Sequence, residues 1–381
     1  MLPLASATTM KRSILIASFV ASGLLFAASI NSQTVTSDMV GFVQPFNTTG
    51  NQINCLGNSD TKIAIPFTRP PEFVGATTAA GSNTLTVSGS PWGANQFQYN
   101  AGANQHNTYF VLIGPHSSTN PKEGRMYQIT SNTANQLTVN NGGDDLSGVA
   151  AGTQILVIPY HTLSSIFPAS DAGVSFLSSG STFIHPTEIL IPNYAGVGTN
   201  LSTGATYFFY NGHWRKVGES GFPDRDDDAL PNAGHFTVRN TTATGTTMTT
   251  LGSVLTKKVT IPLVTRANGQ QDNFVSVIRP VDVALSDLGL ISSGAFQPST
   301  STFIHTDELL VFAHAPAQQN RSAAATYFFY SGGDGAHWRK VGDSGFPNRD
   351  ADVIPAGDGF VIRKGATAGG PLVYWTNAPT Y

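Results

Sequence analysis

The chain is poor in cysteine, in charge and in long apolar runs. Cys55 is the only cysteine among 381 residues, so no disulfide can form within the chain. Charged residues make up 11% of the sequence and the formal net charge is −3, whereas an ordinary soluble protein carries about 25% charged residues. This balance gives no basic field for nucleic acid and disfavours nucleic acid as a partner. We also expect no transmembrane helix in the mature chain, because no segment after residue 30 is long and apolar enough.

The one long apolar run lies at the N-terminus. Lys11 and Arg12 precede a charge-free stretch over residues 13–30, and the residues that follow are polar. This order is typical of a secretory signal peptide, and we expect it to span residues 1–29. The alternative is a retained membrane anchor. Export would deliver the protein to the periplasm, the cell surface or the extracellular space.

Cys55 has two interpretations in an exported protein. The string INCLG is typical of a strand end, where a buried thiol is inert. The alternative is a bridge between two chains.

The rest of the chain contains a tandem repeat. Between the two copies the first two shared strings are offset by 120 residues and the third by 124, and the extra residues lie in SGGDGA, a lengthened hairpin turn. Two related modules present the same surface twice, which suits binding or assembly better than one catalytic pocket. The shared strings are STFIH at 181–185 and 301–305, ATYFFY at 205–210 and 325–330, and HWRKVG at 213–218 and 337–342.

Short β-branched and aromatic runs separated by Gly, Asn, Ser and Asp predict an all-β fold of tandem, antiparallel, sandwich-like modules. Short helical turns are expected at residues 162–167 and 282–289, just before each repeat copy. The clearest predicted strands are residues 84–88, 108–114, 125–130, 136–140 and 154–160. The predicted parts are a leader (30–76), a first β module (77–160), repeat copy 1 (161–245), bridging strands (246–280) and repeat copy 2 (281–381).

Several longer strings together resemble an exported, β-rich protein family of environmental bacteria. They are SDMVGFV in the leader, EGRMYQITSNTANQLTV in the first β module, and the paired TYFFY and HWRKVG blocks. The resemblance covers nearly all of the mature chain. It implies secretion and a shared β-rich build, and it carries no activity and no functional residues.

An acidic turn in each copy is the first candidate site. Oxygen ligands at alternate positions of a loop are typical of calcium sites, so calcium is the one cofactor that the sequence suggests. Neither turn has the glycine and distal Glu of an EF-hand loop. The alternative is a solvated turn whose Asp side chains cap the backbone and whose Arg neutralises them. The candidate ligands are Asp224, Asp226 and Asp228 in copy 1, and Asn348, Asp350 and Asp352 in copy 2.

A His and a Glu three residues apart form the second candidate in each copy. Both pairs follow the string STFI, read here as a strand, on which residues three apart point to opposite faces. Zinc would need a third ligand, for which His213 and His337 are available. The alternative is a hydrogen bond at a module edge. The pairs are His185 with Glu188 and His305 with Glu308.

The third candidate is aromatic and basic. If the tryptophans face outward, each copy presents an aromatic ring with flanking cations, which suits stacking on a sugar or gripping a partner loop. If they face inward, they belong to the core and the cations are solubilising edge residues. The residues are Tyr210, Trp214 and Arg215 in copy 1, and Tyr330, Trp338 and Arg339 in copy 2.

Catalysis has little support, because the chain contains no GxSxG elbow, and a secreted hydrolase is disfavoured. An outer-membrane barrel is disfavoured because Pro379 interrupts the last strand pattern. We therefore expect a non-catalytic exported protein that acts in assembly or adhesion, with a carbohydrate-binding module as the alternative. Its partners would be other copies of itself or a surface glycan. In a polymeric version, VGFVQPF at residues 40–46 adds as a strand to a neighbouring chain.

Overall fold

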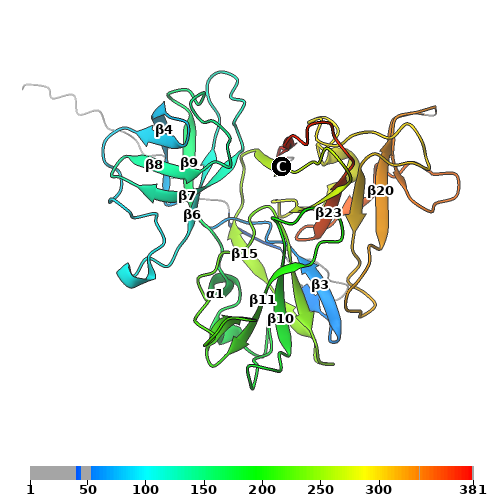
Figure 1. The fold of residues 1–381 in the computed structure, drawn as a ribbon, viewed down its shortest axis with the longest axis horizontal. Coiled ribbons are helices and arrows are strands. Elements are labelled where there is room, and N and C mark those ends of the chain that lie inside the picture. Colours follow the sequence, from blue (N-terminus) through cyan, green and yellow to red (C-terminus); the bar gives the residue numbers. More distant parts are fainter. Residues whose placement is uncertain (1–39, 44–52, 334, 380–381) are drawn as a thin grey trace, which may run out of the picture. The chain divides into compact units, whose positions relative to one another are not determined.

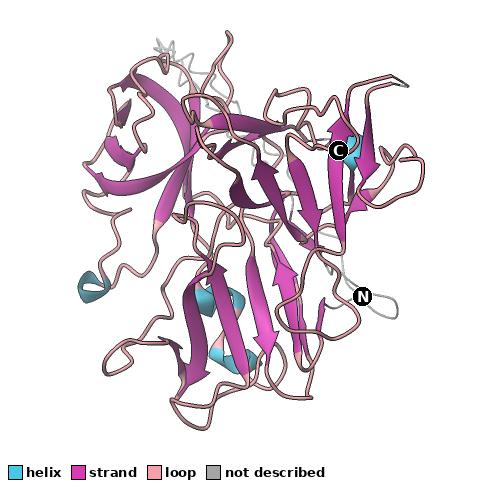
Figure 2. Cartoon of the chain, turned by 45° about the vertical axis from the view of Figure 1, so that its right-hand side comes forward, coloured by secondary structure: helices cyan, strands magenta, loops and turns pink. Residues whose placement is uncertain are grey.

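The computed structural model describes residues 40–43, 53–333 and 335–379 (Figure 1). Nearly all regular structure in these residues is antiparallel β-strand, and the few helical segments are single turns (Figure 2). The expected all-β fold is therefore confirmed. The predicted signal peptide lies outside the described residues.

The first β module contains a closed six-stranded barrel with the strand order β4-β5-β8-β7-β6-β9. The five strands expected from the sequence in this region all form. Along β5 and β8, half-buried and buried residues alternate, which is the pattern of strands with one face on a core. The strands are β4 (Phe73–Ala80), β5 (Thr84–Val87), β6 (Tyr109–Ile113), β7 (Met126–Asn132), β8 (Gln136–Asn140) and β9 (Gln154–Pro159).

The first repeat builds a five-stranded antiparallel sheet in the order β12-β11-β10-β13-β3. The hairpin of β11 and β12 pairs Phe209 with Trp214, and both side chains lie on the core face. The edge strand β3 comes from the leader, more than a hundred residues before the rest of the sheet. The strands are β3 (Ser59–Ile63), β10 (Thr187–Pro192), β11 (Thr203–Tyr210), β12 (His213–Lys216) and β13 (Phe236–Asn240).

The second repeat builds the same sheet in the same order, β21-β20-β19-β23-β17. Its edge strand β17 comes from the bridging segment, as β3 comes from the leader. Each repeat therefore begins earlier than its shared strings, and in the first repeat the barrel is an insertion between β3 and the rest of the sheet. The strands are β17 (Gln271–Ser276), β19 (Glu308–Val311), β20 (Ala325–Tyr330), β21 (His337–Lys340) and β23 (Gly359–Lys364).

Short strand pairs and helical turns complete each repeat. The two expected helical turns form, as α1 (Leu163–Ile166) with Thr162 as its capping residue and as the 3₁₀ turn η3 (Leu285–Asp287). The pairs are β1 (Val40–Val43) with β15 (Thr250–Ser253), β2 (Ile53–Cys55) with β14 (Thr246–Met248), β16 (Val259–Leu263) with β24 (Val373–Asn377), and β18 (Val283–Ala284) with β22 (Val353–Ile354); the remaining 3₁₀ turns are η1 (Ala101–Ala103) and η2 (Ala169–Asp171).

Cys55 ends β2 in the core of the first repeat, where 1% of its surface is exposed. Burial raises the pKa of the thiol to about 12, so the thiol is protonated and unreactive at neutral pH. The expectation that Cys55 is buried is confirmed.

Candidate functional site

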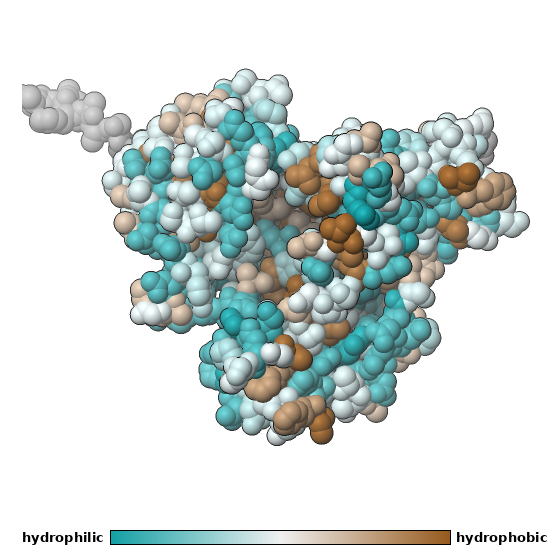
Figure 3. Space-filling view, in the orientation of Figure 1, coloured by the Kyte–Doolittle hydropathy of each residue, from teal (hydrophilic) through white to brown (hydrophobic). Residues whose placement is uncertain are grey.

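Two apolar side chains protrude from each repeat into solvent. The exposed fraction is 89% for Phe183 and 71% for Ile184 in the first repeat, and 84% for Phe303 and 77% for Ile304 in the second. We call these pairs the first tip and the second tip. Figure 3 shows scattered apolar patches, coloured brown, on a surface that is otherwise mostly polar. Exposed apolar groups of this size are typical of interaction sites.

A local hydrogen-bond network holds each tip in one conformation. Ser181 Oγ accepts hydrogen bonds from the backbone N–H groups of Phe183 and Ile184, both at 3.3 Å. Ser301 Oγ accepts the same two bonds in the second tip, at 3.1 and 3.2 Å. The tips are therefore ordered turns that present their side chains without a large loss of entropy on binding.

The His and Glu pairs support these turns. His185 Nδ1 lies 3.0 Å from Glu188 Oε1, its Nε2 lies 3.2 Å from the Thr182 carbonyl oxygen, and its ring stacks on Phe208 at 3.9 Å. His305 makes the same contacts in the second repeat. The expected hydrogen bond at a module edge is confirmed. The expected strand over STFI is wrong, because these residues form a bend before β10 and β19, and this bend lets His and Glu meet.

In each repeat a second aromatic residue belongs to a turn and has a strained backbone conformation. Phe222 and Phe346 have φ angles of 46° and 45°, and this left-handed conformation costs a residue with a Cβ about 1–2 kcal/mol. Arg215 Nη1 donates to the Phe222 carbonyl at 2.7 Å, and Arg339 Nη1 donates to the Phe346 carbonyl at 2.5 Å. Phe346 contacts the second tip, with its ring 6.0 Å from the ring of Phe303. Strain of this kind is often retained at functional sites.

The tryptophans do not take part in this surface. Trp214 is 0% exposed and Trp338 is 1% exposed, and the Trp214 indole N–H donates to the Phe167 carbonyl at 2.9 Å. Tyr210 and Tyr330 are half-buried at the ends of β11 and β20. The hypothesis of an outward tryptophan platform is therefore wrong for these indoles, because the hairpin pairing directs them into the core. The alternative that places them in the core is confirmed.

The acidic turns cover the outer edge of each sheet. Asp226 Oδ1 accepts from the backbone N–H of Trp214 at 2.7 Å, and the Trp214 carbonyl accepts from Arg225 N at 2.9 Å. Asp350 makes the same bond to Trp338 N at 2.8 Å. These contacts satisfy backbone groups of β12 and β21 that would otherwise be open to a further strand. They support the interpretation of a structural turn.

The other predicted calcium ligands also have protein partners. Asp228 accepts from the Tyr207 hydroxyl at 2.7 Å, and Asp352 accepts from the Tyr327 hydroxyl at 2.9 Å. Asp224 and Asn348 each accept a backbone N–H two residues later, in Asp226 and Asp350.

Within the described ranges, one group of three potential metal ligands has its donor atoms within 4.8 Å of one another, namely His213, Asp224 and Asp226. His213 Nδ1 contacts Asp226 Oδ2 at 2.9 Å. The second repeat has Asn348 in place of Asp224. Calcium binding at these turns stays a prediction. Among the described residues, neither His213 nor His337 forms a three-ligand group with a His–Glu pair, so the third zinc ligand considered above is not brought to those pairs.

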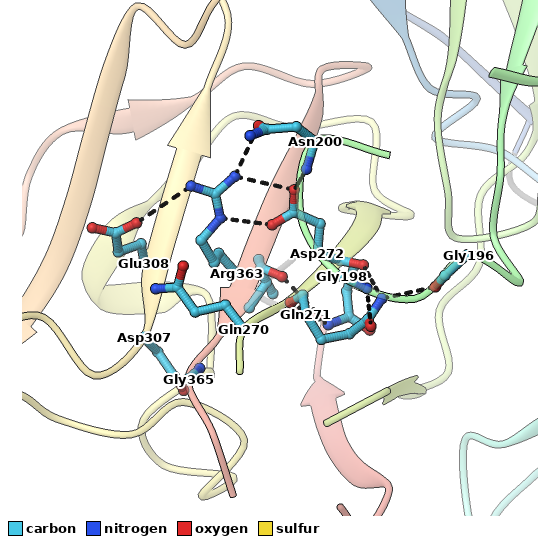
Figure 4. Close-up of polar contacts among 12 residues, drawn as sticks. Gly196, Gly198, Asn200, Gln270, Gln271, Asp272, Asp307, Glu308, Arg363 and Gly365 are labelled. Atoms are coloured by element: carbon cyan, nitrogen blue, oxygen red, sulfur yellow. Dashed lines mark hydrogen bonds and ion pairs between the residues drawn. The ribbon is translucent and has the colours of Figure 1, made fainter. Parts of the chain in front are cut away.

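Two Asp–Arg–Asn clusters join the repeats, and neither was predicted from the sequence. We call them the first clamp (Asp60, Arg239 and Asn320) and the second clamp (Asp272, Arg363 and Asn200). In the second clamp, Arg363 Nε and Nη2 donate to the two carboxylate oxygens of Asp272 at 2.7 and 3.1 Å (Figure 4). Asn200, from the first repeat, donates its backbone N–H to Asp272 at 2.7 Å and accepts from Arg363 at 3.2 Å.

The first clamp has the same three residue types, with the roles of the two repeats exchanged. Arg239 donates to both oxygens of Asp60 at 2.7 Å, and Asn320 of the second repeat donates its N–H to Asp60 at 2.7 Å. Each repeat thus supplies an Asp–Arg pair to itself and an Asn to the other. Both Asn residues have positive φ, 53° for Asn200 and 50° for Asn320, a conformation that Asn tolerates better than most residues. Beside the clamps, the backbone N–H groups of Asp60 and Asp272 donate to the Gln318 and Gly198 carbonyls at 3.0 and 2.9 Å, so the edge strands β3 and β17 also have backbone partners in the other repeat.

The comparisons with known proteins give no match: no protein-family model, no curated protein and no solved structure is similar to this chain. Among the residues that the structure describes, no helix is long and apolar enough to cross a membrane.

Proposed function

We propose that the chain is a non-catalytic exported protein that acts in assembly or adhesion at the cell surface or in the extracellular matrix. The observation that carries this proposal is the pair of tips. Phe183 and Ile184 recur as Phe303 and Ile304, although these side chains are at least 71% exposed and contribute little to either core. Core packing accounts for the buried residues that the two repeats share. It does not account for the four tip residues, because their side chains are exposed.

The His–Glu pairs, the acidic turns and the aromatic hairpins, which the two repeats also share, each have a structural role. The His–Glu pairs hold the tips, the acidic turns cover the β12 and β21 edges, and the aromatic hairpins fill the cores. Among the described residues, the tips are the most exposed apolar side chains that the two repeats share, since Val217 and Val341 are only 42% and 41% exposed. Two weak apolar contacts on one chain can act together, since linked sites gain avidity without new contacts.

Contact through side chains is better supported than strand addition. The acidic turns cover the edge strands β12 and β21, and at the opposite edges the backbone N–H groups of Asp60 in β3 and Asp272 in β17 donate to the Gln318 and Gly198 carbonyls, so both edge strands of each five-stranded sheet have partners within the chain. The leader strand β1 (Val40–Val43) pairs with β15 of its own chain. A polymer in which this leader joins a neighbouring chain would first have to break that pairing.

Retention on a surface tests the proposal. The double variant Phe183→Ser/Ile184→Ser removes the first tip, Phe303→Ser/Ile304→Ser removes the second, and the fourfold variant removes both. We expect the wild type to assemble in sedimentation velocity or to be retained on a methyl-terminated surface, and the fourfold variant to do neither. Val174→Ser/Val197→Ser, which removes two exposed apolar side chains outside the tips, serves as the matched control. A fourfold variant that is folded and behaves like the wild type in both assays would sink the proposal.

A further inference from the structure

A cavity lies among the barrel, the first repeat and the second repeat. Its volume is about 320 Å³, within the range of about 300–1,000 Å³ that is typical of small-molecule sites. None of its walls belongs to the tips, so it is a separate feature of the molecule. The residues that matter for its chemistry are Met126, Tyr160, Tyr194, Asn232, Gln271 and Phe274.

Two polar groups on the wall have unused hydrogen-bonding capacity. Within the described part of the chain, the Tyr160 hydroxyl has no hydrogen-bond partner, and burial raises the pKa of Tyr160 to about 12. The Asn232 amide donates to Met126 Sδ at 3.1 Å, a weak acceptor, and its carbonyl oxygen accepts no bond from a described residue. Both residues are half-buried, so water can reach these groups, and a ligand hydroxyl can take the place of that water.

The cavity has no free charge. Asp272 is the only ionised side chain among the described residues that line it, and its carboxylate is bound by Arg363 and by the Asn200 N–H. The Gln271 amide is also occupied, since it accepts from Gly198 N at 2.9 Å and donates to the Gly196 carbonyl at 3.0 Å (Figure 4). A charged ligand would enter without a counter-charge, so the site suits a neutral one.

Aromatic rings form another part of the wall. Tyr194 and Phe274 meet edge to face with their ring centroids 5.8 Å apart, and Tyr160 packs against Phe110 at 4.9 Å. Rings of this kind pack on the C–H face of a sugar, while a hydroxyl and a carboxamide bind its hydroxyl groups. We propose that this cavity binds one ring of a neutral sugar, with Tyr160 and Asn232 as its hydrogen-bonding residues.

The test is ligand-observed NMR and calorimetry on the mature chain with the methyl glycosides of glucose, galactose, mannose and N-acetylglucosamine. We expect at least one to bind with a millimolar dissociation constant, as is typical of a ligand of this size. Tyr160→Phe removes one hydroxyl and should weaken binding about three- to tenfold. Asn232→Leu, which keeps the side-chain size, should weaken it by a similar factor.

Two controls make the result specific. Tyr99→Phe removes a hydroxyl from an exposed tyrosine of the barrel loop and should leave the affinity unchanged. The fourfold tip variant should also bind sugar normally, so failure of the tip proposal and failure of this one are distinguishable. The assignment is overturned if none of the four glycosides binds, if Tyr160→Phe and Asn232→Leu both bind as tightly as the wild type, or if glucuronate or glucosamine binds better than the neutral sugars.

Discussion

We predict that His235 makes the folded protein sensitive to acid. The residue precedes β13, is 0% exposed, and packs so closely on Gly359 that a Cβ at that glycine would lie 2.3 Å from His235 Cβ. Burial, with a smaller contribution from Lys62, lowers the pKa of His235 from 6.5 to about 3. The imidazole is therefore neutral in the folded protein, and its Nδ1–H can donate to the Val275 carbonyl at 3.3 Å.

The sign and size of the effect follow from this shift. Because the pKa of His235 is lower in the folded state than its unfolded value of 6.5, its contribution to stability is complete above that pH and is lost as the pH falls toward the folded value. At about pH 4.5 the unfolded chain gains a proton that the folded chain does not, which lowers the free energy of unfolding by about 2.7 kcal/mol.

His235→Gln removes the titration and keeps an amide donor near Val275. We expect urea unfolding at about pH 7.5 and about pH 4.5 to show that the free-energy difference between wild type and variant shifts by about 2.7 kcal/mol in favour of the variant on acidification. The difference at neutral pH measures the altered packing and serves as the reference. Parallel pH profiles for the two proteins would refute the reasoning.

Three further predictions follow from buried and clustered polar groups. Burial raises the pKa of Asp358 from 3.8 to about 6, so Asp358→Asn should raise the free energy of unfolding by up to about 3 kcal/mol at neutral pH and by nothing below about pH 4, in urea titrations at both pH values. Asn320→Ala removes the side chain that accepts from Arg239 at 2.7 Å and should lower the free energy of unfolding by about 1–2 kcal/mol; Asn104→Ala, another Asn with positive φ, is the control for backbone conformation. Asp226→Ala should lower it by about 1–3 kcal/mol equally in calcium and in EDTA, whereas calcium stabilisation present in the wild type and absent in the variant would establish a calcium site.

Local patterns were enough to predict the strands and the helical turns. Half-buried and buried residues alternate along the barrel strands β5 and β8, and α1 begins after a Thr that caps its turn, so these elements are decided by neighbouring residues. The string STFIH misled because its composition is that of a strand. Ser181 Oγ binds the N–H groups of Phe183 and Ile184, and this local competition turns the chain before the sheet begins.

The clamps and the membership of β3 depend on pairing between distant residues. Thr61 pairs with Val238 in the sheet, and the barrel lies between them in the sequence. Nothing in the leader alone indicates this partner. In hindsight one signal was present: an Asp is the second residue of the comparable strings SDTKIAIPF and QDNFVSVIRP, and an Asn recurs at 200 and 320, the same offset as the tips.

The dissociation rate from a methyl-terminated surface tests the central claim most directly. The wild type, each single-tip variant and the fourfold variant would be compared under the same flow, after circular dichroism confirms that all are folded. If the two tips act together, removing either one should speed dissociation about a hundredfold or more, and removing both should abolish retention. Equal dissociation rates for the wild type and both single-tip variants would contradict the account.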